Sequence, residues 1–143
     1  MSESAQYAAR RAVQQRLAGA GAWGTRVRQD RGLSSWEFPY VVHVFSGGGE
    51  RNRMLAHSDP ELVLLVKAVS DIAAEASAAA AAIAALLDDS GLQDDADDYL
   101  YGGSQWHILS ITQEDYITYS EYVSETRTLF HEGARYRFVM EAI

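Results

Sequence analysis

The chain has 143 residues, a hydrophobic share of 48 % and no cysteine. That length indicates a single domain over residues 1–143, with enough apolar residues for a core. Disulfides and thiol nucleophiles are excluded. No apolar run reaches the ~18 residues of a membrane span, and the N-terminus lacks the pattern of a signal peptide, so we expect no membrane association.

The net charge of −8 is unevenly distributed along the sequence. Residues 1–53 contain eight arginines and four acids, a net charge of +4, whereas residues 71–98 contain eight acids and no base. The overall acidity argues against nucleic-acid binding by bulk charge.

The first half of the chain is predicted to form a helix followed by strands. Apolar residues at helical spacing predict a helix over residues 4–18. Residues 25–29 and 38–45 are predicted strands, and Pro39, which has no amide hydrogen, belongs at a strand's start or on an edge. The polar side of the predicted helix consists of Arg10, Arg11, Gln14 and Gln15.

Turn residues are predicted to separate the next strands. The glycines at 47–49 are predicted to break the strand and begin a polar hairpin tip, and Asp59–Pro60 is predicted to be a turn. Residues 62–69 are nearly all apolar, which is typical of a central strand buried on both faces. Lys67 is the exception, and its aliphatic stem can pack while its amine reaches water.

The stretch from Ser70 to Gly91 predicts a second helix over residues 71–89. It begins with residues that cap helices, ends at a glycine and contains ten alanines. Its opposite side carries small residues, including Ala78, Ala81 and Ala85, which permit close approach of another element or subunit; a GC-rich genome explains the alanines equally well. The apolar stripe predicted to face the core consists of Ile72, Ala76, Ala79, Ile83, Leu86 and Leu87.

The second half is predicted to end in strands. Residues 92–103 are predicted to form an acidic loop and residues 106–111 a strand. Residues 116–122 alternate weakly and are interpreted as a strand or an excursion. A turn at 124–126 precedes a clearly alternating strand at 135–142.

The predicted order of elements indicates an α+β fold. Strands joined by short turns pair antiparallel, and helices must cover a sheet face. We therefore expect a two-layer sandwich of a mainly antiparallel sheet with both helices on one face. Gly133 is interpreted as a bulge.

Catalytic and metal-binding motifs are largely missing from the sequence. None of the four histidines has metal-ligand spacing, and His43 and His107 are interpreted as packing residues in strands. We expect no catalytic residue, no metal and no cofactor. Four aspartates lack the spacing of a calcium loop and are interpreted as a solvated acidic segment: Asp94, Asp95, Asp97 and Asp98.

Several short motifs together resemble the tail terminator, or tail completion, family of long-tailed bacteriophages. The resemblance covers most of the chain, and its motifs are structural rather than chemical. They are the N-terminal amphipathic helix, Thr25-Arg26-Val27, residues 38–44, the glycines at 47–49, residues 83–88 and residues 133–138.

The resemblance implies a structural virion protein without enzymatic activity. Family members form a hexameric ring on the tail tube, which ends tube polymerisation and joins the tail to a head-completion or connector protein. The expected location is the tail or neck of the virion after assembly in the host cytoplasm. Another neck or head-completion protein is the first alternative, and a small enzyme or ligand-binding domain using His107 or His131 is the second.

A ring also implies two kinds of surface. DNA passes through it without specific binding, and an acidic lining by Asp94, Asp95, Asp97 and Asp98 would repel phosphate. Subunits meet head to tail through two different patches, for which opposite charges are suited. The residues expected at the subunit interface are Arg10, Arg11, Arg26, Arg28, Ala78, Ala81 and Ala85.

Overall fold

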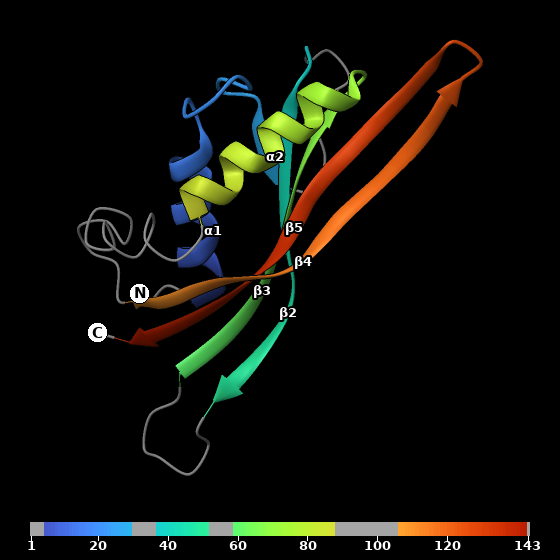
Figure 1. Ribbon diagram of the computed structural model, residues 1–143. Helices are drawn as coiled ribbons and strands as arrows, with labels where there is room; N and C mark the ends of the chain where they lie inside the picture. The colour runs from blue at the N-terminus through green and yellow to red at the C-terminus, as the bar shows by residue number, and fades with distance from the viewer. Residues whose placement is uncertain (1–4, 30–36, 52–58, 88–105, 143) are drawn as a thin grey trace.

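The computed structural model describes residues 5–29, 37–51, 59–87 and 106–142 (Figure 1). Among these residues, no helix is long and apolar enough to cross a membrane. The elements are α1 (Ala5–Leu17), β1 (Val27–Gln29), β2 (Tyr40–Arg51), β3 (Asp59–Ser70), α2 (Ala73–Leu87), β4 (Trp106–Ser124) and β5 (Arg127–Ala142).

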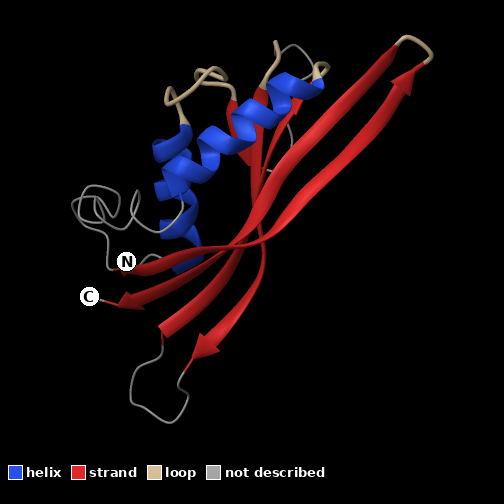
Figure 2. Cartoon of the chain, in the orientation of Figure 1, coloured by secondary structure: helices blue, strands red, loops and turns tan. Residues whose placement is uncertain are grey.

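The strands form a five-stranded sheet in the order β1-β2-β3-β5-β4. β1 and β2 are parallel, and the other three pairings are antiparallel. Side chains from both helices share one buried cluster with the sheet, so both helices lie on the same face (Figure 2). The expected two-layer α+β sandwich is therefore confirmed.

Side chains along β3 show why the sheet has one buried face. Leu64, Val66 and Ala68 are fully buried beneath the helices, whereas Val63 and Leu65 are half-buried on the other face. The prediction that this strand is buried on both faces is wrong. Helices in the described chain cover only one face, so apolar side chains at alternate positions remain partly exposed.

The second helix matches its predicted stripe in most positions. Ala76, Ala79, Ile83 and Leu87 are buried, and Leu86 packs partly buried against the core. Ile72 is 55 % exposed, contrary to the prediction, because it precedes the first helical residue.

Ser70 fixes the chain that enters α2. Its hydroxyl oxygen accepts a hydrogen bond from the Ile72 amide at 3.1 Å and donates one to the Glu75 carboxylate at 2.9 Å. The bonds hold the residue before α2 and the Glu75 side chain of its first turn in place.

Two predicted turns are parts of strands. β2 continues through the glycines at 47–49, which pair with Glu61, Leu62 and Val63 of β3. β3 begins at Asp59, and Pro60 pairs with Glu50. Backbone pairing along a long hairpin overrides the local turn preference of glycine and proline. The register shifts once, between Phe45 and Gly47.

β4 is a single strand of 19 residues where the sequence suggested two separate segments. Its register against β5 shifts at three places, between Ile108 and Ser110, Gln113 and Asp115, and Tyr122 and Ser124. Each shift moves the following side chains out of simple alternation. The weak alternation of residues 116–122 therefore reflects bulges rather than an excursion from the sheet.

Gly133 lies where the backbones of β3 and β5 approach each other closely. The β3–β5 and β4–β5 registers pass through it without a shift, so its interpretation as a bulge is wrong. A Cβ atom added there would lie 1.9 Å from the Val66 carbonyl oxygen and 2.6 Å from Lys67 Cα. Glycine is needed because the backbones of β3 and β5 approach too closely for any side chain.

We predict that Gly133→Ala lowers the free energy of unfolding by at least ~2 kcal/mol, because overpacking against backbone cannot be relieved by a rotamer change. Urea denaturation of the purified variant measures this. The control Ser120→Ala, on an exposed position of the neighbouring strand, should stay within ~0.5 kcal/mol of the parent. Equal stability of Gly133→Ala and the parent would contradict the close approach.

Substitutions in α2 should follow burial. Ile83→Ala is expected to cost ~2–5 kcal/mol, because Ile83 is 1 % exposed and its removal leaves a cavity. Leu86→Ala should cost less, since Leu86 lies at the rim of the core. Thermal denaturation of the two variants side by side checks the order, and a larger loss for Leu86→Ala would show that the helix is rotated.

Candidate functional site

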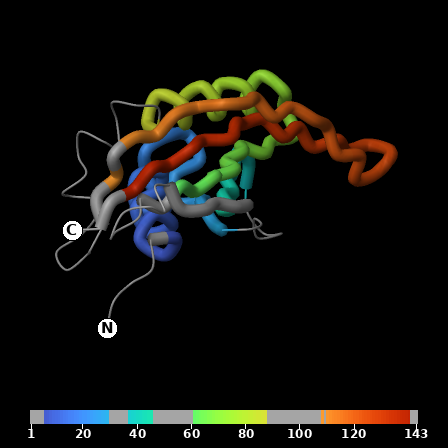
Figure 3. The backbone as a smooth tube through the Cα atoms, turned by 90° about the horizontal axis from the view of Figure 1, so that it is seen from below, coloured from blue at the N-terminus to red at the C-terminus, as the bar shows by residue number. Residues whose placement is uncertain are grey.

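The far half of the β4–β5 hairpin projects from the body of the protein. We call residues 116–132 the arm. β5 pairs with β3 only from Phe130 to Val139, so residues 121–129 at the end of the arm are held by β4–β5 pairing alone. Figure 3 shows this end extending beyond every other described element.

Large apolar side chains on the arm face solvent. Tyr116 is 84 % exposed, Tyr122 72 % and Val123 51 %. Among the described strands, β4 pairs only with β5, so its outer edge carries unpaired backbone groups. Exposed tyrosines beside an open strand edge are typical of a protein–protein interface.

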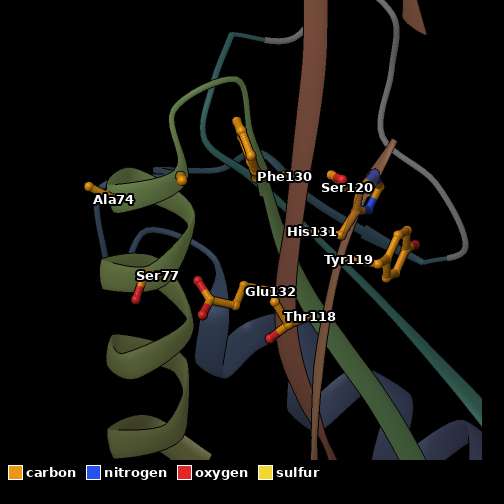
Figure 4. A pocket seen from close by; sticks show the side chains of 9 residues that line it. Ala74, Ser77, Thr118, Tyr119, Ser120, Phe130, His131 and Glu132 are labelled. Carbon is orange, nitrogen blue, oxygen red and sulfur yellow. The ribbon is translucent and has the colours of Figure 1, made fainter. Parts of the chain in front are cut away.

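A groove runs between the arm and α2. It consists of two pockets of about 540 and 320 Å³ that share Ser77 and Glu132, and we call it the arm groove. Its α2 side is lined by small residues, including Ala74 and Ala81. The Glu132 carboxylate points across the groove toward Ser77, beside Thr118 (Figure 4).

The opposite face of the arm carries a cluster around His131. Its Nε2 lies 3.0 Å from the Glu121 carboxylate, and its ring stacks on Tyr119 with centroids 4.4 Å apart. Lys67 donates a hydrogen bond to the Tyr119 hydroxyl. These contacts tie the base of the arm to β3.

The environment shifts the pKa values of His131 and of Tyr40 on β2, which interacts with the charge of Glu121. Burial lowers the pKa of His131 and Lys67 lowers it further, against an opposing effect of the hydrogen bond to Glu121. Burial raises the pKa of Tyr40, and the charge of Glu121 adds to this. His131 is therefore largely neutral near pH 7 and serves as a packing and hydrogen-bonding group.

Ion pairs join the strands on the same outer face. Arg137 donates hydrogen bonds to Glu61 at 2.8 Å and to Glu114, and these bonds raise its pKa, while the bond from Arg137 lowers the pKa of Glu114. The guanidinium Nη1 of Arg135 lies 3.6 Å from the carboxylate Oδ2 of Asp115. Exposed pairs of this kind contribute little to stability, but they use the charges of this face within the subunit.

A basic surface lies on α1, at the β1–β2 end of the sheet. The helix contains three arginines and no acid. The Arg10 and Arg11 guanidinium groups lie 5.1 and 5.4 Å from the centre of the Tyr7 ring, which is 43 % exposed. We call these three residues, with Gln15, the α1 basic face. A pocket of about 260 Å³ beside it reaches Gln29 and His43.

The other residues expected at an interface differ in their exposure and in their contacts within the subunit. Ala78, Ala81 and Ala85 are exposed on α2, but only Ala81 lines the arm groove. Arg28 is exposed on β1. Arg26 donates hydrogen bonds to the Pro39 and Ala22 carbonyls at 3.0 Å each, so its guanidinium helps to fix the chain between α1 and β2.

Several expected site residues do not form a site in the described chain. Asp94, Asp95, Asp97, Asp98 and His57 lie outside the described residues, and His107 is placed only as a residue of β4. His43 is 1 % exposed and its Nε2 lies 2.8 Å from the Gln14 side chain, as expected for a packing histidine. Within the described ranges, no three metal-ligating side chains gather.

Comparison with known proteins gives a fold match without a sequence match. No protein-family model matches the chain, and no curated protein matches it. A chain from the virion of a native gene transfer agent (GTA) particle is 16 % identical, covers 90 % of this chain and 92 % of its own, and has a TM-score of 0.59. At this identity the similarity establishes a shared fold.

A second solved structure shares the fold over almost the whole length. It is 14 % identical, the alignment covers 99 % of each chain, and the TM-score is 0.56. Coverage near completeness on both sides shows that the similarity of fold extends over the whole chain and not over one part of it.

The pKa of His131 predicts a pH dependence of stability. Because burial holds this pKa below its ordinary value of 6.5, the unfolded chain binds a proton more readily than the folded chain. The contribution of neutral His131 to the free energy of unfolding is thus complete above pH ~6.5, and it falls as the pH drops through that value. Urea midpoints of the parent should decrease more steeply below pH ~6.5 than those of His131→Gln, which keeps a hydrogen bond to Glu121 but does not titrate; parallel curves would exclude this role.

Proposed function

We propose that the chain is a structural protein of a phage-like virion and forms the ring that caps the tail tube. The observation that carries the proposal is the fold shared, over nearly the whole of both chains, with a chain of the GTA virion particle. The sequence motifs that resemble tail terminators point to the same class. In this proposal a hexamer ends tube polymerisation and joins the tail to the head.

The described histidines support a structural protein better than an enzyme. His131 borders the 540 Å³ pocket, but its Nε2 is bonded to Glu121 and its ring is stacked against Tyr119. His43 is bonded to Gln14 in the core. A general base needs a proton acceptor directed at substrate, and these two side chains are instead engaged in packing.

The proposed ring has two partners besides its own copies. The tail tube protein contacts one side of the ring, and a head-completion or connector protein contacts the other. The protein then resides in the tail or neck of the virion after assembly in the host cytoplasm. The alternative is another neck or head-completion protein of similar build.

Gold-labelled antibody on purified particles tests this position. Label at the junction of head and tail, together with overgrown tails and tail-free heads when the gene is disrupted, is the expected result. In solution, rings should have a mass near six times 15.8 kDa. Label on the capsid surface or at the tail tip would reject the ring at the neck, and particles without the protein would reject the virion role itself.

A ring on the tail axis also gives the four aspartates a proposed role as an acidic lining for DNA passage. Duplex DNA carries one negative charge per ~1.7 Å, so a basic lining would hold it in a salt-dependent way, whereas an acidic lining repels it. Replacing Asp94, Asp95, Asp97 and Asp98 by Lys should slow DNA ejection at low salt, with recovery at high salt. Ejection kinetics that match the parent at low salt would remove the aspartates from the channel.

A further inference from the structure

The arm groove contains an acid that the described chain leaves without a partner. Glu132 lines both pockets of the groove, is partly buried, and makes no hydrogen bond or ion pair with any other described residue. A partly buried carboxylate without a partner can bind a cationic side chain that enters the groove. Glu121 and Glu125 add negative charge to the arm, against the single base Arg127.

The α1 basic face has the complementary chemistry. α1 carries Arg10, Arg11 and Arg16 without an acid, and Tyr7 lies beside the first two. Arginine binds carboxylates in a bidentate manner and stacks on aromatic rings, and tyrosine and arginine are enriched at interfaces. In the groove, Tyr116 offers such a ring at 84 % exposure.

The dimensions of the two surfaces also correspond. The groove follows α2 from Ala73 to Ala84, which is about 16 Å at the rise of an α-helix. The α1 basic face extends from Tyr7 to Gln15, about 12 Å on the same scale. The wall of the arm groove that α2 provides consists of alanine and serine, whose short side chains let another helix approach closely.

The basic face and the groove of one molecule cannot meet. α2 lies between α1 and the arm, and the basic face borders β1 and β2 at the other end of the sheet (Figure 1). Two different, complementary patches on one chain make a heterologous contact, which closes into a ring when the rotation permits.

We propose that the arm groove of one copy binds the α1 basic face of a second copy, with Arg10 paired to Glu132. This inference rests on the proposed ring function and names the surfaces that build the ring. The arm then reaches over the neighbouring subunit, and the exposed Tyr116 packs against it. Because the arm is long, its contact with the neighbouring subunit holds the two subunits in one orientation.

Cysteine cross-linking tests the contact cleanly, because the chain has no cysteine of its own. Ser77→Cys places a thiol in the groove and Gln15→Cys places one on the α1 basic face. In particles or rings carrying both changes, oxidation should give a ladder of multimers. Mixed single variants should give dimers, and either single variant alone should not. Gln15→Cys with Arg135→Cys, on the outer sheet face, is the matched control and should give no ladder.

Charge reversal tests the proposed pair. Arg10→Glu or Glu132→Arg alone should reduce the cross-link yield at least about tenfold, and the combined variant Arg10→Glu/Glu132→Arg should restore it. Circular dichroism verifies that each variant is folded. Reversal at Arg127, the arm's own base, serves as a control for the general effect of charge and should leave the yield within about twofold.

The outcomes separate this inference from the proposed function. Particles that contain the protein but give no ladder, or no recovery in the combined variant, overturn the groove contact and leave the virion role standing. Particles that lack the parent protein overturn the virion role. A ladder that disappears with each single reversal and returns with the combined variant supports the contact.

Discussion

The close approach of β3 and β5 at Gly133 is the constraint on which the other features depend. At this point Lys67 and Ile117 lie opposite the glycine on its two neighbouring strands. Because no side chain fits between the backbones, the arm leaves the sheet from a tightly held base. From this base the Glu132 side chain points across the arm groove toward α2 and the His131 ring points the other way (Figure 4), so one backbone contact positions both.

One-sided coverage of the sheet divides the protein into surfaces with separate tasks. Helices bury one face and build the core, including Phe138, Leu64 and Ile83. The outer face neutralises its charges within the subunit, as at Arg137 with Glu61 and Glu114. Glu132 in the groove and Arg10 on α1, at the two ends of the described chain, make no ion pair with another described residue.

Prediction from the sequence succeeded where one periodicity acts over a long stretch. The spacing of apolar residues predicted both helices and the buried face of α2. In α2, buried residues recur about once per helical turn, as at Ala79, Ile83 and Leu87. It failed where pairing overrides local preference: the glycines at 47–49 lie inside β2, and Asp59–Pro60 begins β3. The arm was not predicted, because the bulges in β4 disturb the alternation that indicates a strand. The tyrosines at 116, 119 and 122, which are exposed in the structure, recur every third residue and could have indicated it.

The sequence by itself determined the fold class, the helix that covers the sheet and the separation of charge between the first helix and the acidic region. These properties depend on composition and on residues near one another along the chain. Only the tertiary structure decided that Glu132 faces a row of alanines across a groove, and that Arg10 lies at the opposite end of the molecule. Such relations join residues that are about fifty or more positions apart, and their distance is fixed by strand register and by the approach at Gly133, which local patterns do not encode.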